Sequence, residues 1–207
     1  MKMLALWLQF ACFSLGSAQN LPLVQAQAEQ KERYFNWQLL RPKTADEDET
    51  PEGWLLGECR ESPSNLSVSS FLNAQGRNSY VVDKLTDDDP TTAWIEGKTD
   101  YGIGEYIEFT AFPLSNWAIL NGYQKDNMSW ENNSRVKKMR ISIENKLAFD
   151  VVLEDKMGIQ TFRLPESIKI DPQKISTGTK IKMQILEVYE GKKFKDVAIS
   201  EIFFIGC

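Results

Sequence analysis

The chain has 207 residues, of which 42% are hydrophobic and 26% charged, and it carries a formal net charge of −5. This size predicts one folded domain with an extension, and the negative balance argues against nucleic acids and anionic membranes as partners. The absence of histidine excludes the nucleophile pairs and metal sites that depend on imidazole. Carboxylates are therefore the remaining candidates for acid–base chemistry.

Residues 1–18 have the pattern of a secretory signal peptide. Lys2 supplies a positive start, residues 4–15 are almost entirely apolar, and residues 16–18 are small enough for cleavage after Ala18. The apolar run is too short for a permanent transmembrane helix. The sequence thus predicts a secreted or periplasmic protein. A lipid anchor at Cys12 is the less favoured interpretation, because the three residues before it match a lipidation motif poorly.

Residues 19–58 are predicted to form an N-terminal extension that lies partly on the domain. Residues 19–33 are rich in Gln, Ala and Glu, which favours a frayed helix. Residues 44–51 (TADEDETP) form an acidic linker with few apolar groups, which is typical of a solvated segment.

Signal cleavage would leave two cysteines, Cys59 and Cys207. In an oxidising compartment an even pair predicts a disulfide, and this one would join the start of the domain to its end. The chain-entropy model assigns so long a loop roughly 4–5 kcal/mol of stabilisation. The alternative is a pair of buried thiols. A metal site would need more ligands than two cysteines provide.

From Leu66 onward, apolar residues alternate with period two, which predicts β-strands. The clearest runs are residues 104–112, 136–144, 148–155, 180–188 and 198–207. In the last run Ile199 and Phe203 are expected on one face. Turn signals separate the runs, and no long segment has a helical period. Residues 59–207 are therefore predicted to form an antiparallel β-sandwich or jelly roll, with Trp94 and Trp117 in its core.

Several short motifs occur in one order along this region. They are residues 69–72, Asp83 with residues 88–94, then 102–105, 121–124, 133–137, 152–155, 185–191 and 198–202. Together they resemble the discoidin-like, galactose-binding-like superfamily, and more closely the glycan-binding translocation domain of bacterial NAD glycohydrolases. The resemblance covers residues 59–207 and implies a jelly roll with binding loops at one end. It does not include the catalytic domain, so we do not expect the NAD glycohydrolase activity here.

Residues 83–92 form an acidic, oxygen-rich turn. Carboxylates, threonine hydroxyls and backbone carbonyls in a tight turn suit a hard cation such as Ca²⁺. The resemblance implies a structural Ca²⁺ below the binding loops, with Asp83, Asp88, Thr92 and Glu201 at the matching positions. The alternatives are a plain capped turn, or a turn in which a salt bridge from Lys84 replaces the ion.

The polar segment 121–135 (NGYQKDNMSWENNSR) is predicted to bind the ligand. Its amides and Tyr123 can hydrogen-bond sugar hydroxyls, and Trp130 can stack on a pyranose ring. The alternative for Trp130 is packing back onto the sandwich. Two residues of the glycine-rich loop, residues 97–104, are secondary candidates for the rim of the binding site. The predicted ligand-binding set is therefore Asn121, Tyr123, Gln124, Trp130, Asn132, Arg135, Lys98 and Tyr101.

These patterns predict an exported, non-catalytic binding module that recognises a glycan, and the resemblance points to a bacterial source. Two alternatives stay open. The sandwich could instead dock a protein, as an interaction module or a structural subunit of the cell envelope. It could also be a carboxylate-only hydrolase, since glycosidases need two carboxyl groups in a cleft. Asp83, Asp88, Glu105 and Glu201 could supply them, although a metal-binding turn explains these residues more simply.

Overall fold

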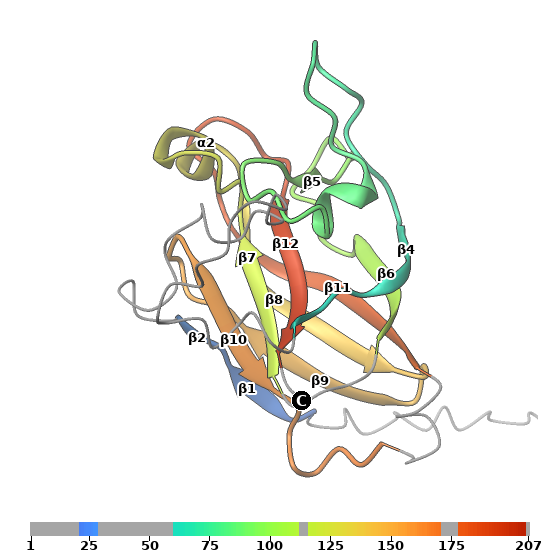
Figure 1. Ribbon diagram of the computed structural model, residues 1–207. Coiled ribbons are helices and arrows are strands. Elements are labelled where there is room, and N and C mark those ends of the chain that lie inside the picture. Colours follow the sequence, from blue (N-terminus) through green and yellow to red (C-terminus); the bar gives the residue numbers. More distant parts are fainter. Residues whose placement is uncertain (1–20, 29–59, 112–115, 171–177, 206–207) are drawn as a thin grey trace, which may run out of the picture.

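The computed structural model describes residues 21–28, 60–111, 116–170 and 178–205. The proposed signal peptide, the acidic linker, Cys59 and Cys207 lie outside these ranges, so cleavage, the linker and the disulfide stay predictions. The described chain folds as two sheets stacked face to face (Figure 1), which confirms the predicted all-β sandwich.

Each sheet has six strands. Sheet A runs in the order β1-β9-β8-β11-β6-β4, with bounds Leu23–Gln25, Leu147–Val152, Arg135–Ile143, Thr179–Tyr189, Tyr106–Ala111 and Ser64–Val68. Sheet B runs β2-β10-β7-β12-β3, with bounds Gln27–Ala28, Ile159–Arg163, Asn116–Asn121, Ala198–Ile205 and Arg60–Glu61, and β5 (Trp94–Ile95) pairs with β12. The pairings between these strands are antiparallel except that of β1 with β9. The chain described here also forms the 3-10 helix η2 (Val82–Leu85) and the α-helix α2 (Asn127–Asn132).

The period-two patterns produce the buried faces that the sequence predicts. In β6, Ile107, Phe109 and Ala111 are buried while the residues between them are partly exposed. Strands β8 and β11 follow the same alternation and pair at the centre of sheet A. Trp94 and Trp117, both predicted to be core residues, are 0% and 1% exposed. The core therefore lies between the sheets, and aromatic side chains are the largest groups buried there.

Strand β12 departs from its predicted alternation. Ile199 and Ile202 both face the main core, whereas Phe203 packs with Leu120 in a smaller cluster of its own, so the prediction that Ile199 and Phe203 share a face is wrong. The physical reason is a change of pairing geometry along β12. Its antiparallel ladder with β7 begins at Glu201, whereas Ile199 forms a parallel bridge with Gly122, and the alternation shifts by one residue between the two.

Residues 21–28 form strands, so the helix predicted over residues 19–33 is wrong in this part. β1 pairs with β9 at the edge of sheet A, and β2 pairs with β10 at the edge of sheet B. Ala26, between the two strands, is fully buried in the main core and donates its backbone N–H to the Val152 carbonyl at 2.9 Å. The Asp150 N–H donates to the Pro22 carbonyl at 2.8 Å. We call residues 21–28 the N-terminal strap, because they satisfy sheet-edge hydrogen bonds that would otherwise face solvent.

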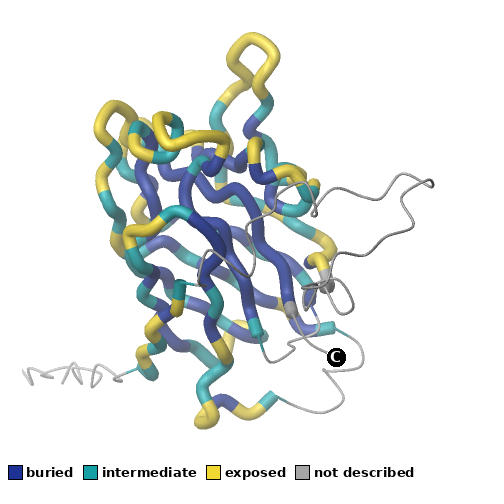
Figure 2. Tube along the Cα trace, turned by 60° about the vertical axis from the view of Figure 1, so that its left-hand side comes forward, coloured by how far each residue is buried: buried dark blue, intermediate teal, exposed yellow. Residues whose placement is uncertain are grey.

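The connecting loops gather at one end of the sandwich, the upper end in Figure 1. This end carries α2, η2, β5 and the loop between β11 and β12. Figure 2 shows exposed loops, in yellow, at this end above the buried strands in dark blue. We call it the loop end. Within the described residues, we find no helix of sufficient length and apolarity to cross a membrane.

Candidate functional site

A cleft of about 230 Å³ opens at the loop end. Its walls come from the loop before η2, from β5, from the segment entering α2 and from the loop before β12. The lining residues are Leu72, Gln75, Asn78, Tyr80, Ile95, Tyr123, Lys125, Asp126, Met128, Ser129, Asn132, Asn133, Phe194 and Asp196. Residues far apart in the sequence thus converge on one hollow.

One wall of the cleft is aromatic. The rings of Tyr80 and Tyr123 meet edge to face, with centroids 6.4 Å apart and planes at 89°. Ile95 and Leu72 belong to the same apolar cluster and support these rings from below. Phe194 stands at the rim and is 42% exposed. An apolar wall with an exposed ring beside it suits a ligand that has one apolar face.

The polar groups of the cleft are largely uncommitted. Tyr80 is 6% exposed, and within the described chain its hydroxyl makes no hydrogen bond to another residue. The same holds for the side chains of Tyr123, Asn132 and Asp196. Burial raises the pKa of the Tyr123 hydroxyl and of the Asp196 carboxyl above their ordinary values. These donors and acceptors are therefore available to a bound molecule.

The helix α2 forms part of the wall and lies inside the polar segment 121–135, for which the sequence analysis predicts no helix. Asp126 caps its N-terminus by accepting the Ser129 N–H at 2.6 Å. This hydrogen bond lowers the pKa of the Asp126 carboxyl. Asn133 closes the other end by donating its side-chain amide to the Ser129 carbonyl at 2.8 Å. An aspartate that precedes a short polar run is an N-cap signal, so this helix was within reach of sequence reasoning.

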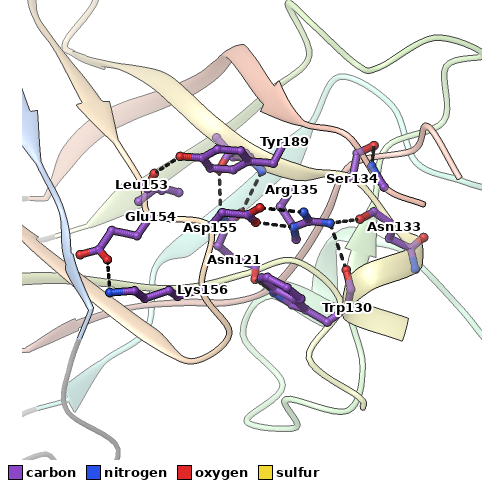
Figure 3. A network of polar contacts seen from close by, with 12 residues as sticks. Asn121, Trp130, Asn133, Ser134, Arg135, Leu153, Glu154, Asp155, Lys156 and Tyr189 are labelled. Carbon is purple, nitrogen blue, oxygen red and sulfur yellow. Dashed lines mark hydrogen bonds and ion pairs between the residues drawn. The ribbon is translucent and has the colours of Figure 1, made fainter. Parts of the chain in front are cut away.

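Trp130 and Arg135 lie together beside the cleft, and neither lines it. The Arg135 guanidinium carbon lies 4.4 Å from the centroid of the Trp130 ring (Figure 3). Arg135 is 6% exposed and holds Asp155 through two hydrogen bonds of 2.8 and 3.1 Å. It also donates to the carbonyls of Trp130 and Asn133, while the Trp130 indole donates to the Asn121 carbonyl at 3.1 Å. This is the packed-back arrangement that the sequence left open as the alternative for Trp130.

Asn121 and Gln124 are also used by the fold. The buried Asn121 amide donates to the Val136 carbonyl at 2.7 Å and accepts the Val136 N–H at 2.9 Å. Gln124 is 4% exposed, donates to the Asn121 carbonyl at 2.7 Å and accepts the Gly158 N–H at 3.0 Å. These side chains therefore fix the base of the segment that carries Tyr123. Of the predicted ligand set, the structure brings Tyr123 and Asn132 into the cleft.

The two rim candidates from the glycine-rich loop lie outside the cleft lining. Lys98 binds the buried Glu105 carboxylate at 2.7 Å, and Tyr101 donates to Glu190 at 2.8 Å. Glu105 also accepts hydrogen bonds from the hydroxyls of Ser69 and Ser70. Burial alone would raise the pKa of Glu105, but Lys98 and the serine hydroxyls bring it below its ordinary value. These contacts tie the loop to the sandwich.

A second carboxyl, Glu96, lies beneath the same loop and is fully buried. It accepts the Lys98 N–H at 2.7 Å and the Val197 N–H at 3.3 Å. Gly102, at a φ of +61°, packs so closely that a Cβ there would lie 2.7 Å from the Glu96 side chain. Burial raises the pKa of Glu96 to about 7 from an ordinary 4.5. Glu96 thus joins the glycine-rich loop to the start of β12.

The acidic turn is held by its own side chains. Asp87 binds Lys84 at 2.8 Å and accepts the Thr92 hydroxyl at 2.9 Å. Asp89 accepts the Thr91 N–H at 2.9 Å, which caps the turn. These contacts are those of the capped, salt-bridged turn that the sequence left open.

The turn also touches β12, because the Ser200 hydroxyl donates to the Pro90 carbonyl at 3.1 Å. The next residue, Glu201, is 2% exposed, whereas Asp83 is exposed on η2. Across residues 21–28, 60–111, 116–170 and 178–205, no group of three or more His, Cys, Asp or Glu side chains is placed to hold a metal ion.

The residues that sequence reasoning missed are Tyr80, Phe194 and Asp196. Tyr80 precedes η2, and Phe194 and Asp196 lie in the loop before β12, so only the fold brings them next to the segment 121–135. A weak signal existed for Phe194, which is a lone aromatic among charged residues (residues 192–196, KKFKD). No comparable signal marks Tyr80 or Asp196.

Comparisons with known proteins agree with this architecture. The family model of the NAD glycohydrolase translocation F5/8 type C domain matches residues 58–205. A solved structure of the CBM32-1, CBM32-2 and M60 catalytic domains of Clostridium perfringens ZmpB superposes on 93% of this chain and 17% of that one, at 9% identity and a TM-score of 0.55. A second structure, of the CBM32-1 and CBM32-2 domains of the same protein, covers 90% of this chain and 41% of that one, at 10% identity and a TM-score of 0.51. At such identities the likeness concerns the fold alone, and this chain spans less than half of either structure. A comparison with curated protein sequences finds no match.

Proposed function

This chain belongs to the NAD glycohydrolase translocation F5/8 type C domain family, and we propose from this premise that it is an exported, non-catalytic module that binds a carbohydrate in the loop-end cleft. The observation that supports the proposal best is the composition of that cleft. Tyr80 and Tyr123 form an apolar wall, and the side chains of Asn132 and Asp196 in the same lining make no hydrogen bonds to other residues in the described chain.

A sugar matches this surface in its chemistry. One face of a hexose ring carries C–H groups that pack on aromatic rings, and the ring edge carries hydroxyls that donate and accept hydrogen bonds. The hydroxyl of Tyr123, the amide of Asn132 and the carboxylate of Asp196 supply partners of both kinds. A volume of about 230 Å³ lies just below the range of drug-sized sites, which suits one or two sugar units at the end of a glycan.

Binding without turnover is the simpler interpretation of the carboxylates. The residues that the sequence offered for a hydrolase, Asp83, Asp88, Glu105 and Glu201, do not line the cleft. Glu105 is engaged by Lys98 and two serines. Of the two cleft carboxylates, Asp126 is committed to capping α2. The cleft therefore does not present the acid and base pair of carboxyl groups that glycoside hydrolysis requires.

A structural Ca²⁺ at the acidic turn remains part of the proposal. The turn and β12 offer oxygen donors only, which suits Ca²⁺. The side chain of Asp88, in the left-handed region at a φ of +61°, and the buried Glu201 would hold the ion together with carbonyls of the turn. Asp87 and Thr92 already bind each other, and Asp83 is exposed. An ion here would stiffen the turn beside the loop end and would take no part in chemistry.

A glycan array with the purified protein tests carbohydrate binding, and two matched variants test whether the cleft is the binding site. Tyr123→Ala removes half of the aromatic pair in the cleft, and we expect it to abolish binding while circular dichroism shows an intact fold. Tyr101→Ala removes a tyrosine of the same loop end that does not line the cleft, and we expect binding to be retained. Loss of binding with Tyr101→Ala or Trp130→Ala, but not with Tyr123→Ala, would move the site away from the cleft. A blank array with folded protein would refute carbohydrate binding and favour a protein-docking module.

A further inference from the structure

We propose that the cleft selects uncharged saccharide ends over acidic ones, and that the Asp196 carboxylate is the group that discriminates between them. This inference rests on the proposed carbohydrate binding and names the ligand class within it. It follows from three observations: the sign of the charges that reach the cleft, the uncommitted state of Asp196, and the rigidity of the wall that carries it.

The charges that reach the cleft are mainly negative. The lining contains two carboxylates, Asp126 and Asp196, and one ammonium group, that of Lys125, which is exposed. Like charges brought together in a partly desolvated site repel each other strongly. A sialic or uronic acid carboxylate in this cleft would therefore meet a like charge.

The lysines of the neighbouring loop do not compensate. Lys192 binds Glu131 on α2 at 2.5 Å. Lys193 lies over the Phe194 ring at 5.0 Å, and Lys195 lies over the Tyr101 ring at 5.5 Å. None of the three lines the cleft. The loop thus presents its aromatic ring and its aspartate in the lining, while Lys192 and Lys195 contact Glu131 and Tyr101 outside it and Lys193 lies over the Phe194 ring.

Asp196 is the cleft carboxylate that no other residue of the described chain engages. It is half-buried, and within the described chain its side chain makes no hydrogen bond or ion pair with another residue. Burial raises the pKa of this carboxyl, which reflects the partial loss of water around it. An ionised carboxylate accepts hydrogen bonds and donates none. Sugar hydroxyls can donate to it, whereas a second carboxylate cannot.

The backbone that carries Asp196 is held by hydrogen bonds on both sides. The backbone N–H of Phe194 donates to the Asn132 carbonyl at 2.8 Å, and the N–H of Ser134 donates to the Asp196 carbonyl at 3.1 Å. The Ser134 hydroxyl donates to the Phe194 carbonyl at 3.1 Å. On the far side, the Val197 N–H is held by the buried Glu96. These contacts place Asn132 and Asp196 on one rigid wall of the cleft.

The test uses pairs of glycans that differ mainly in charge: galactose-terminated against galacturonate-terminated oligosaccharides, and the carboxyl methyl ester of sialyl-N-acetyllactosamine against its free acid. Affinities are measured by calorimetry or biolayer interferometry at pH 7.5 and constant ionic strength. We expect the acidic member of a pair to bind weaker by on the order of tenfold. In Asp196→Asn the gap should close to about threefold or less, since the repulsion is gone while the side-chain volume is kept. Glu166→Gln, which removes an exposed negative charge outside the cleft lining, should leave the gap unchanged.

The outcomes separate the two proposals. Equal binding of neutral and acidic members by the unaltered protein overturns the selectivity and leaves the carbohydrate function standing. A gap that persists in Asp196→Asn overturns the role of Asp196. Absence of binding to every member by folded protein overturns the carbohydrate function, and the selectivity falls with it. Because the first comparison uses the unaltered protein, it does not depend on the variant folding correctly.

Discussion

Replacing the buried Glu96 by glutamine should change how the stability of this protein depends on pH. The carboxyl is fully buried, and burial raises its pKa to about 7 from an ordinary 4.5. The folded protein therefore holds a proton on Glu96 at pH values where the unfolded chain has lost it. This preference stabilises the folded state below pH 4.5, and the stabilisation is lost as the pH rises toward 7. Above pH 7 both states are deprotonated and no further change follows.

The size of the effect follows from the two pKa values. Full titration from below 4.5 to above 7 corresponds to about 3 kcal/mol, and between pH 5 and pH 8 the contribution falls by about 2.5 kcal/mol. Glutamine does not titrate and keeps an acceptor for one of the two backbone N–H groups that Glu96 binds. Asp196 and Glu105, which also act on the Glu96 carboxyl, are present in both proteins. Their own contributions therefore largely cancel in the difference.

The assay is urea unfolding of the unaltered protein and of Glu96→Gln at pH 5, 6, 7 and 8, followed by tryptophan fluorescence at constant ionic strength. Relative to the unaltered protein, the variant should gain about 2.5 kcal/mol of unfolding free energy between pH 5 and pH 8. Glu131→Gln, at a carboxyl that is 47% exposed, serves as the matched control and should show no such trend. A difference between variant and parent that stays constant to within about 0.5 kcal/mol across this range would refute the reasoning.

Three further outcomes are expected. Trp94→Phe should lower the free energy of urea unfolding by about 1–2 kcal/mol more than Trp117→Phe. The Trp94 indole donates to a carbonyl at 3.0 Å, whereas the buried Trp117 N–H has no hydrogen-bond partner among the described residues; equal costs would count against this account. Arg135→Lys should lower the unfolding free energy by about 1–3 kcal/mol and shift Trp130 emission, because lysine cannot reproduce the paired bonds to the Asp155 carboxylate; an unchanged spectrum would show that the stacked pair does not persist in solution. If the acidic turn holds Ca²⁺, the free energy of unfolding in 1 mM Ca²⁺ should exceed that in EDTA by about 2–3 kcal/mol when this concentration is roughly one hundred times the Kd. Glu201→Gln should abolish the difference, and identical melting curves would remove the ion from the proposal.

The strands were predictable because their signal is local. In β6 and β8 the side chain at each position decides its own face, so the period-two pattern of the sequence is also the pattern of burial. The face change in β12 was not predictable, since it arises where the antiparallel ladder with β7 gives way to a parallel bridge between Ile199 and Gly122. The strands in residues 21–28 were missed for a similar reason. The segment (LPLVQAQA) is too short to show a period-two pattern of its own, and the open edges of β9 and β10 impose the conformation.

The candidate site was predictable only in part. The segment 121–135 does reach the loop end, and Tyr123 and Asn132 line the cleft. Polar character alone, however, did not distinguish residues that face a ligand from residues that hold the backbone. Asn121 and Gln124 have the same side chains as a typical sugar-binding residue, yet both are buried and bonded to main-chain groups. Such side chain to backbone bonds depend on which strand lies opposite, and a single sequence does not encode that explicitly.

The N-terminal strap has a practical consequence for anyone who expresses this protein. The family match begins at residue 58, and a recombinant chain trimmed to that boundary would lose β1, β2 and the buried Ala26. The freed edges of β9 and β10 would then present bare amide and carbonyl groups, the surface on which strands of separate molecules add to one another. A trimmed protein that self-associates would thus report on its boundary rather than on a native assembly. Recombinant chains that begin at residue 19 keep the seam between the sheets closed.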